Sequence, residues 1–453
     1  MRPYEEKVLS NHKIIIDMPA LRWAILALFA VTFVWPDYGE LKVSSLPNLA
    51  PPRIFTLLVF LIMGIQFITA QSNIAKIWEI ISRGWGLFLI LIAYQLIKVI
   101  TAVIDPQGML GLYMFLKIDV FTDMLLMFLV LYFVRDFSDF AKIIDTLIIA
   151  SLVVTLIVVV ESVVQHNLFD TIISDTNWSV DAALLDKSRD DKYRAQGSFG
   201  HPIILAQYAV CLLPLAWWRV SQLNGLKKLL FGIAIVGLGA DVFLTNTRSG
   251  IGLLVIALFV LGVWNMILWW KRNNQQLVKM LIAVQLGGAA IVLLGLMLRF
   301  MSNLLGGRTQ EESMSSYHRV QMWHAAIPKI MESPLSGYGP TNAMTNVGFV
   351  GHFGNLFMDN YFLLLSLESG LIATFLLVII FLYLSKDIFL LLFAKLRDER
   401  EMLRFALSLS IGLFAVFQVI HASSELFRFF YLLAGCKIAL DFSKNSDTVL
   451  KAG

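Results

Sequence analysis

Long apolar runs separated by short polar segments make up most of this chain. About twelve of these runs have the length expected of helices that cross a hydrocarbon core of roughly 30 Å. The pattern therefore predicts an all-α polytopic membrane protein with about twelve spans. In chain order the predicted spans are Ala20–Trp35, Ile54–Ala70, Gly84–Ile104, Met114–Val134, Ile143–Val164, Ile203–Val220, Leu229–Asn246, Ile251–Trp270, Met280–Leu298, Tyr361–Leu384, Phe405–Ile420 and Phe429–Leu440.

Basic residues indicate the orientation of these spans. Lys and Arg concentrate in alternate short loops and near both ends of the chain, and an excess of these residues is typical of cytoplasmic loops. An even number of spans, with both termini in the cytoplasm, puts all of them on that side. The residues are Arg2, Lys7, Lys13, Lys227, Lys228, Lys271, Arg272, Lys279, Lys386, Lys395, Arg397, Arg400, Arg404, Lys444 and Lys451.

Three polar segments then face the other, non-cytoplasmic side. They are a loop over residues 165–202, a tight turn at Thr247-Arg248-Ser249-Gly250, and a long loop over residues 299–358. No soluble domain, repeat array or low-complexity tract interrupts the pattern, so residues 1–453 are expected to form a single integral membrane domain. Amphipathic stretches over residues 74–83 and 387–402 are expected on the inner surface.

The long loop has internal structure of its own. Val320, Trp323, Ile327 and Ile330 recur at helical spacing, which predicts a short amphipathic helix lying at the membrane interface. Ser333-Pro334 and the following glycines would end it.

Composition agrees with the class and excludes others. Hydrophobic residues make up 58% of the chain, charged residues only 15%, and the mean hydropathy is +0.74, values too apolar for a soluble chain of this length. The net charge of +4 is too small to suggest a nucleic-acid partner. Cys211 and Cys436 both stand in apolar runs, so no disulfide framework is expected. The polar N-terminus gives no sign of a cleavable signal peptide.

The long loop also gathers cationic and titratable side chains on the face where basic residues are usually sparse. Arg308, His318, Arg319 and His352 all lie within it. Such a concentration at one outer surface predicts that the protein handles an anionic, lipid-borne substrate there. No metal-ligand spacing, P-loop or dinucleotide fingerprint is present, so no cofactor and no metal site is predicted.

Two arginines are the leading candidates for binding that anion. Arg248 stands in an otherwise uncharged turn between two apolar helices; it is either a headgroup-facing surface arginine or a fixed cation for a phosphate, and a charge in a tight bundle turn favours the second. Arg319 is expected to open the amphipathic helix, where an anion would also be favoured by the helix dipole. The alternative for Arg319 is a loop ion pair with Glu311 or Glu312.

Acidic and weaker candidates complete the set. Asp359 is either an N-cap or a carboxylate base beside the arginines, and both interpretations can hold together. Glu368, two turns further on, should point into the bundle. Arg194 is more readily explained as a loop charge near Asp190 or Asp191. Charges that interrupt the apolar spans are more simply explained as structural; they are Lys98, Lys117, Asp119, Asp123, Glu161 and Asp241. His421 and Glu425, near the end of the eleventh span, are minor candidates.

Four segments between Gly197 and Ala373 combine these residues with turn-forming glycines. They are Gly197-Ser198-Phe199-Gly200-His201-Pro202 with Ala206; Thr245-Asn246-Thr247-Arg248-Ser249-Gly250; Arg319 with Trp323 and Ser333-Pro334-Leu335-Ser336-Gly337-Tyr338-Gly339; and Asn360 followed by Gly370-Leu371-Ile372-Ala373. In order and placement this set resembles the bacterial O-antigen ligase and Wzy-type polysaccharide polymerase superfamily. The resemblance implies a GT-C-like inner-membrane glycosyltransferase of about a dozen spans with one long periplasmic loop.

The chain departs from the family pattern at two positions. The family's ligases carry His where this sequence has Asp359, and a second Gly where it has Ala373. The resemblance assigns that His as the base that deprotonates the acceptor hydroxyl. Asp can take the role because the chemistry requires a positioned base, although it needs desolvation to raise its pKa.

The resemblance and the residues together predict a metal-independent polymerase of lipid-linked repeat units. The donor would be an undecaprenyl-diphosphate-linked oligosaccharide and the acceptor a glycan or lipid, with Arg248 and Arg319 on the diphosphate and Asp359 as the base. Asn360, Arg194, His201, His318 and Glu368 are the predicted substrate-binding residues. The expected location is the bacterial inner membrane with the site facing the periplasm, among membrane lipids and a chain-length regulator or other polysaccharide-assembly proteins.

Two alternatives stay open at this point. A ligase would transfer the glycan to a lipid A core or to a protein, and the departure at Asp359 favours a polymerase slightly. A flippase or exporter would move lipid-linked sugars without making or breaking bonds. This hypothesis is supported by the charged residues within the spans, such as Lys98, Lys117 and Asp241.

Overall fold

The computed structural model describes residues 19–36, 39–41, 51–69, 71–170, 178–179, 187–189, 192–272, 295, 310–350, 356, 358–390, 398–422 and 424–442. Arg308 and His352 lie outside these ranges, as does the predicted span Met280–Leu298 apart from residue 295.

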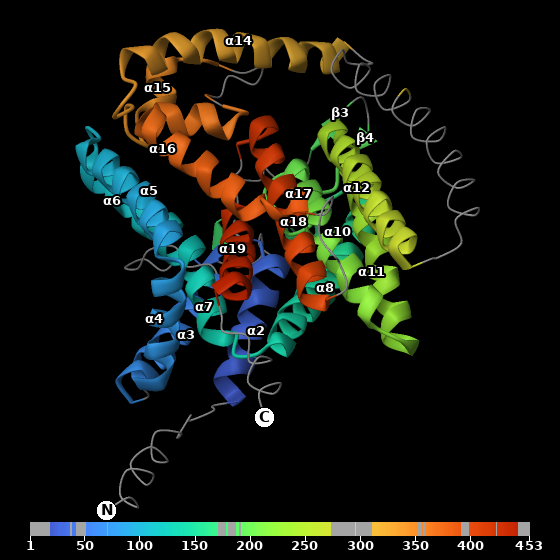
Figure 1. The fold of residues 1–453 in the computed structure, drawn as a ribbon. Helices are drawn as coiled ribbons and strands as arrows, with labels where there is room; N and C mark the ends of the chain where they lie inside the picture. Colours follow the sequence, from blue (N-terminus) through green and yellow to red (C-terminus); the bar gives the residue numbers. More distant parts are fainter. Residues whose placement is uncertain are drawn as a thin grey trace, which may run out of the picture.

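Helices make up nearly all of the described structure (Figure 1). They are α2 (Pro19–Val34), α3 (Pro51–Thr69), α4 (Gln71–Arg83), α5 (Trp85–Ile104), α6 (Gly108–Phe115), the π-helix η1 (Leu116–Met124), α7 (Leu125–Phe133), α8 (Phe137–Val164), α10 (Pro202–Gln222), α11 (Gly225–Leu244), α12 (Arg248–Arg272), α14 (Gln310–Glu332), α15 (Ala343–Val347), α16 (Tyr361–Ser385), α17 (Asp387–Leu390), α18 (Glu399–Ile420) and α19 (Phe427–Phe442).

Strands are confined to two short antiparallel pairs in the described residues. β1 (Glu40–Leu41) pairs with β2 (Trp178–Ser179), and β3 (Ser188–Arg189) pairs with β4 (Lys192–Tyr193).

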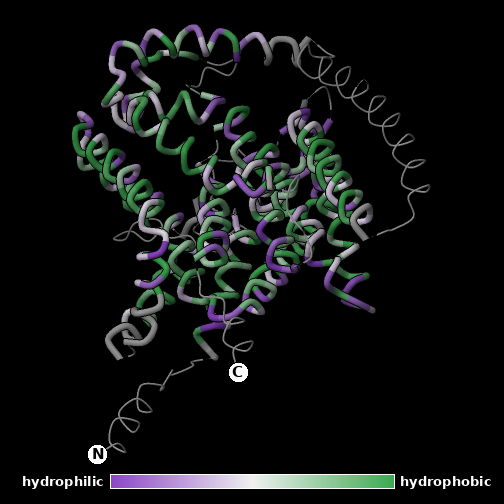
Figure 2. Tube along the Cα trace, viewed as in Figure 1, coloured by the Kyte–Doolittle hydropathy of each residue, from purple (hydrophilic) through white to green (hydrophobic). Residues whose placement is uncertain are grey.

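Six described helices are long and apolar enough to cross a membrane. They are Trp85–Ile104, Phe137–Val164, Pro202–Gln222, Arg248–Trp269, Tyr361–Phe389 and Glu399–Ile420, and the segments Leu21–Val34 and Pro51–Gly64 are shorter apolar helices. Apolar residues dominate these helices in Figure 2. The predicted class, an all-α polytopic membrane protein, is therefore confirmed. The predicted span Met114–Val134 is not one regular helix, because the π-helix η1 interrupts it between α6 and α7.

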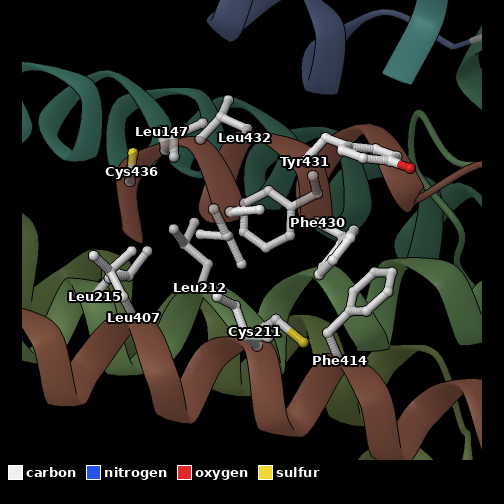
Figure 3. Close-up of a cluster of buried hydrophobic side chains, with 14 of the residues drawn as sticks. Leu147, Cys211, Leu212, Leu215, Leu407, Phe414, Phe430, Tyr431, Leu432 and Cys436 are labelled. Carbon is white, nitrogen blue, oxygen red and sulfur yellow. The ribbon is translucent and has the colours of Figure 1, made fainter. Parts of the chain in front are cut away.

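The core of the bundle lies where α8, α10, α18 and α19 meet. Figure 3 shows Leu147, Cys211, Phe414 and Phe430 from these four helices packed around one interior volume. The rings of Phe414 and Phe430 stack with their centroids 5.4 Å apart. Both cysteines are buried and unpaired, as predicted, and contribute as small apolar side chains.

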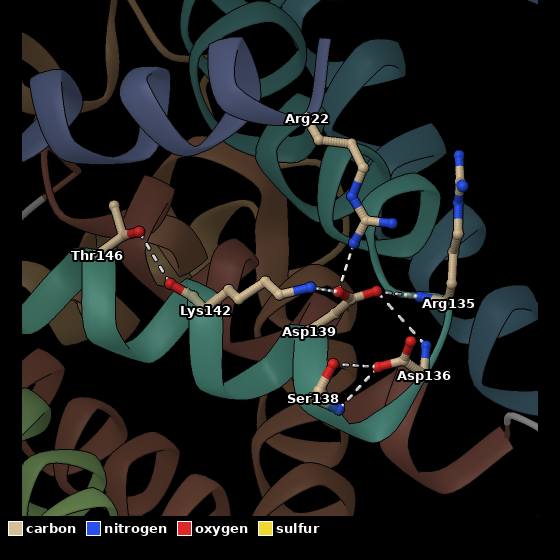
Figure 4. A network of polar contacts seen from close by, with 7 residues as sticks. All are labelled: Arg22, Arg135, Asp136, Ser138, Asp139, Lys142 and Thr146. Carbon is tan, nitrogen blue, oxygen red and sulfur yellow. Dashed lines mark hydrogen bonds and ion pairs between the residues drawn. The ribbon is translucent and has the colours of Figure 1, made fainter. Parts of the chain in front are cut away.

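A buried carboxylate joins α2 to the start of α8. Asp139 is fully buried; its Oδ1 accepts hydrogen bonds from Arg22 on α2 and, at 2.8 Å, from Lys142 on α8 (Figure 4). Its other oxygen accepts from the backbone N–H of Arg135 at 2.9 Å. Asp136 caps α8 in a reciprocal capping box with Asp139. A buried charge needs such partners, so this contact fixes how the two helices meet.

A break inside α16 organises the opposite end of the bundle. Gly370 has φ 80° and ψ 172°, a backbone conformation almost exclusive to glycine. The break removes the helical hydrogen bonds that would join Leu371 and the next residue to Leu367 and Glu368. These backbone groups bond instead to the turn that follows α14: Leu371 N donates to Pro334 O at 2.7 Å, Tyr338 N to Leu367 O at 2.7 Å, and Gly339 N to Glu368 O at 3.0 Å.

The same turn is held from its other side by Asp105, just after α5. The carboxylate accepts from the backbone N–H of Thr341 at 2.9 Å, the side chain of Asn342 at 3.1 Å, Gln107 N at 2.8 Å, and the hydroxyl of Thr341. Burial alone would raise the pKa of Asp105, but these hydrogen bonds outweigh it and hold the pKa below its ordinary value.

The predicted amphipathic helix exists as α14, and it is longer than predicted. It lies across the end of the bundle over α16 (Figure 1), with Met322, Ala326 and Ile330 buried against that helix. Val320, Trp323 and Ile327 are 54%, 43% and 47% exposed. The four predicted apolar positions therefore divide between a face on the bundle, which includes Ile330, and a face turned away from it.

Replacing Gly370 with Ala should destabilise the protein. Any Cβ would meet the carbonyl oxygen of Leu335 and force the residue into a disfavoured conformation, which costs about 1–3 kcal/mol before the clash is counted. A thermal unfolding midpoint measured in detergent should fall clearly. Gly262→Ala is the matched control, because its Cβ would meet nothing within 4 Å on α12 and should be neutral or slightly stabilising. Equal midpoints for Gly370→Ala and wild type would contradict the role given to the break.

Candidate functional site

An ion pair between α14 and the residue preceding the α16 cap lies at the centre of the site. Arg319 donates from Nε to Oδ2 of Asp359 at 3.1 Å, and both side chains are partly exposed. The backbone N–H of Asp359 also points to the sulfur of Met322, one turn further along α14, at 3.1 Å. The structure thus brings together two of the three predicted catalytic residues, which are 40 positions apart in the chain.

Two local predictions about these residues are wrong. Arg319 does not open its helix, because α14 begins at Gln310, so the helix dipole does not explain its affinity for an anion. Asp359 is not the N-cap of α16. Asn360 caps the helix, accepting from the backbone N–H groups of Phe362 and Leu363 at 2.9 and 3.1 Å. Because Asn360 does the capping, the carboxylate of Asp359 is left to face Arg319.

A histidine faces the other oxygen of the same carboxylate. His421, the residue that ends α18, has its Nδ1 3.8 Å from Oδ1 of Asp359. The separation is about 0.5 Å or more beyond a good hydrogen bond, and catalytic contacts of this kind commonly tighten when substrate binds. Asp359 therefore lies between a guanidinium and an imidazole.

His201 stacks on His421 and completes this group. The ring centroids are 5.1 Å apart with an interplanar angle of 29°. His201 is also the N-cap of α10, where its Nδ1 accepts the backbone N–H of Ile203 at 3.1 Å. An acceptor at Nδ1 needs a lone pair there, which puts the ring proton of neutral His201 on Nε2.

The charges around Asp359 set its protonation state. Burial would raise the pKa of this carboxyl, but the neighbouring His421 imidazole and the Arg319 guanidinium outweigh burial and lower the pKa. Asp359 is accordingly ionised over the neutral pH range. A carboxylate in this state is a weak base but a strong orienting group for a neighbouring imidazole.

The turn that carries His201 is anchored by a buried glutamate of α8. Glu161 is fully buried and accepts from the backbone N–H groups of Gln196 and Gly197 at 2.9 and 2.7 Å and from the hydroxyl of Tyr193 at 3.0 Å. The Ser198 hydroxyl donates to Phe33 O on α2 at 2.5 Å. This charge within a predicted span is thus structural, in the way expected.

Arg194 lies beside the turn that precedes Arg248. Arg194 is buried and donates from Nε to the carbonyl of Thr245 at 3.1 Å, at the end of α11. Arg248 is the first residue of α12, and a Cβ on Gly250 would come within 2.7 Å of Ala206 on α10. Only glycine allows α10 and α12 to approach so closely here, and this approach brings Arg248 to the end of the bundle that carries His201.

A second charged group adjoins the turn at residues 197–201. The carboxylate of Glu425 accepts from the backbone N–H of Gly200 at 3.2 and 3.3 Å and lies 3.4 Å from the fully buried Arg428. Lys187 donates to Gly200 O at 3.4 Å. Burial, then the nearby charge of Arg194, lowers the pKa of Lys187 to about 8. An anion bound here would raise the pKa of this lysine again.

The remaining predicted site residues lie apart from the ion pair. The ring of His318 packs edge-on against Phe349, with the ring centroids 6.5 Å apart. Glu368 is half-buried two turns inside α16, where it interacts electrostatically with Lys98 on α5 and Asp119 on η1. Lys98 and Asp119 form an ion pair with each other. No group of three or more His, Cys, Asp or Glu side chains suited to a metal ion occurs in the part of the chain that the structure describes.

His421 is the residue whose importance sequence reasoning understated. It stands directly after the apolar run of α18, and the predicted orientation puts it at the same face as Asn360. The shared position of His421 and Asn360 at one face of the membrane was the signal in the sequence that could have identified His421. Beside the pair, the rings of Tyr361 and Phe427 pack 4.6 Å apart and join the starts of α16 and α19.

Taken together, the fold and this site define a polytopic membrane protein with an acid, an imidazole and a guanidinium assembled at one end of its helical bundle. Residues 233–378 match the family described as O-antigen ligase. This match, over about a third of the chain, supports the superfamily of O-antigen ligases and Wzy-type polymerases, whose members are glycosyltransferase-like enzymes. The matched residues include Arg248, Arg319 and Asp359, whereas His201 and His421 lie outside them. No curated protein matches the chain.

Replacing Glu161 with Gln should loosen the turn that positions His201. The two backbone N–H groups bond to different oxygens of Glu161, so the amide would set its N–H₂ group against one of them, and a lost buried acceptor costs about 1–3 kcal/mol. The unfolding midpoint should fall, and proteolysis near residues 193–200 should increase. Tyr193→Phe removes only one of the three bonds and should have a smaller effect. Unchanged stability and proteolysis in Glu161→Gln would show that the turn is held by other contacts.

Proposed function

We propose that this protein transfers a glycan from a polyprenyl-diphosphate donor to a sugar hydroxyl, acting as a polymerase of lipid-linked repeat units. The observation that carries the proposal is the position of Asp359 between Arg319 and His421, because this arrangement supplies both an anion-binding cation and a base-orienting carboxylate. The family match supports a ligase or polymerase type of activity without separating the two.

Arg248 and Arg319 bind the diphosphate of the donor in this proposal. Guanidinium groups donate in a planar, bidentate manner to phosphate and do not deprotonate. Arg319 is engaged by Asp359 in the absence of substrate, so donor binding shares or replaces that contact. Both cations stabilise the charge that develops on the diphosphate as it leaves, which is electrostatic catalysis.

Asp359 and His421 activate the acceptor. The ionised carboxylate holds the imidazole by its Nδ1, and the opposite nitrogen, Nε2, takes the proton of the acceptor hydroxyl. The hydroxyl oxygen then forms a bond to the anomeric carbon of the donor sugar. The bond from that carbon to the diphosphate breaks, and the electron pair leaves with the diphosphate. The proton remains on His421 until solvent removes it.

Three features stabilise the positive charge that His421 acquires. Asp359 is its counterion, and His201 offers the face of a neutral ring. The residue also ends α18, and a cation is favoured at a helix C-terminus. Asn360 contributes by capping α16 and so fixing where Asp359 stands.

The orientation of the protein in the membrane is part of the same proposal. About twelve spans, with both termini in the cytoplasm, put the site and the loops at residues 165–202 and 299–358 on the periplasmic face of the bacterial inner membrane. The donor would be undecaprenyl-diphosphate-linked, and a chain-length regulator or another assembly protein would act beside it.

The ligase remains the second candidate because the family match supports it equally. The exporter is less well supported. Of the charges within the spans that it needs, Lys98 is paired with Asp119, and Asp241 accepts from the hydroxyl of Thr155 at 2.7 Å. These groups serve contacts between helices.

Purified protein in proteoliposomes, supplied with a lipid-linked oligosaccharide, should produce a ladder of longer lipid-linked glycans. Repeated transfer predicts the ladder, because each product is again an acceptor. A single added unit on a separate lipid acceptor would favour the ligase. Movement of the donor across the bilayer with no new glycosidic bond would overturn the proposal in favour of an exporter.

Replacing His421 with Ala should lower kcat by about 10²–10⁴-fold, the usual contribution of a general base, with a much smaller change in KM for the donor. Added imidazole should restore part of the activity, which a purely structural loss would not allow. Asp359→Asn should also lower kcat, without rescue by imidazole, and Arg319→Gln should raise KM for the donor as well.

His324→Gln is the matched control for these variants. His324 is an exposed histidine on α14, outside the ion pair, and its replacement should leave turnover unchanged. If His421→Ala were as active as wild type while Asp359→Asn was inactive, Asp359 itself would be the base.

A further inference from the structure

The helices that carry the site also enclose a cavity at their opposite ends. It has a volume of about 390 Å³ and lies where α10 and α12 end and α18 begins. Trp217 and Ser221 of α10, Trp264 and Trp269 of α12, and Glu399 of α18 are among the residues that line it. His201, Arg248 and His421 belong to the other ends of these three helices, about 30 Å away at 1.5 Å per residue.

One wall of the cavity contains a hydrogen-bond donor that lacks an acceptor. Trp264 is 2% exposed, and its indole Nε1 has no hydrogen-bond partner among the described residues. The ring packs against Phe405 of α18 with the ring centroids 4.5 Å apart. A buried indole N–H normally finds a partner, and leaving it without one is costly. A ligand with an acceptor oxygen would satisfy it.

The rim of the cavity, in contrast, carries a negatively charged group that favours a cation. Glu399 is an exposed carboxylate in the first turn of α18. It interacts electrostatically with Arg219, but that guanidinium is already bound by both oxygens of Asp145, at 2.5 and 2.9 Å. Glu399 can therefore bind a cation in the cavity. The half-buried rings of Trp217 and Trp269 suit an ammonium group, which is attracted to aromatic faces.

The position of the cavity along the spanning helices indicates which ligand offers both an acceptor oxygen and an ammonium group. The cavity lies at the ends of apolar helices long enough to span a membrane, the level of lipid headgroups, where tryptophan is enriched. We propose that the cavity binds the headgroup of a zwitterionic phospholipid with a primary ammonium, of the phosphatidylethanolamine type. A phosphate or ester oxygen accepts from Trp264, and the ammonium binds Glu399 between the tryptophan rings.

The bound lipid would hold three helix ends together. α10, α12 and α18 each contribute a wall, so the headgroup acts as a fixed spacer between them. An anionic headgroup such as phosphatidylglycerol satisfies the indole but meets the carboxylate with the wrong charge. The site therefore selects the zwitterion over the anion.

The test measures which lipid the full-length protein retains. The protein is reconstituted in vesicles of equal parts phosphatidylethanolamine and phosphatidylglycerol, extracted in mild detergent, and its retained lipids are measured by native mass spectrometry. Wild type should retain phosphatidylethanolamine in preference. Trp264→Phe keeps the ring but removes the N–H donor, and Glu399→Gln removes the charge; each should lower the ratio of the two lipids by about tenfold.

Two further variants keep the result interpretable. Ser221→Trp fills the cavity from its rim without removing either binding group and should also abolish the preference. Trp85→Phe replaces a tryptophan that is 65% exposed on another helix and should leave the ratio unchanged. Equal retention of both lipids by wild type, or a preference that survives in Trp264→Phe, Glu399→Gln and Ser221→Trp, would overturn the proposal.

Discussion

A helix that breaks inside a membrane bundle must find new partners for the backbone groups it frees, because the hydrocarbon around it supplies none. In this protein the break is at Gly370, and the partners come from the turn at residues 334–339. The turn can occupy that position only if α14, which precedes it, lies across α16. One unsatisfied stretch of backbone therefore determines where the longest described extramembrane helix rests, and that helix carries Arg319 to Asp359.

The site that results is assembled from helix ends. α10, α12 and α16 begin there, at Pro202, Arg248 and Tyr361, and α18 ends there before His421. Three helix N-termini contribute partial positive charge where an anionic diphosphate would bind, and one C-terminus favours a protonated imidazole. Each end is fixed by its own contact: Asn360 and His201 cap their helices, and Gly250 lets α12 approach α10. The positions of these helix ends are thus set by backbone hydrogen bonds and packing.

Hydrophobic periodicity was sufficient to predict most helices and the class of the protein. α10, α12 and α16 begin and end close to the predicted positions, because a long apolar run in lipid has little alternative to a helix. α8 and α18 end where predicted but begin earlier, at Phe137 and Glu399 instead of Ile143 and Phe405, because polar first turns extend them beyond the apolar run. Periodicity could not reveal the π-helix within Met114–Val134, since an extra residue per turn leaves no mark on composition. Nor could it show which of Asp359 and Asn360 would cap α16, because both residue types favour the cap and the geometry of Arg319 decides between them.

The departure from the family pattern at Asp359 has a structural counterpart. A histidine at this position could not form a salt bridge with Arg319, because an imidazole is either neutral or positively charged. With aspartate there, the salt bridge forms, and the imidazole is found instead at His421, which meets the carboxylate from a different helix and stacks on His201. Asp359 and His421 thus lie close together in space although they are 62 residues apart in the chain (421 minus 359). For this reason no local motif identifies the pair.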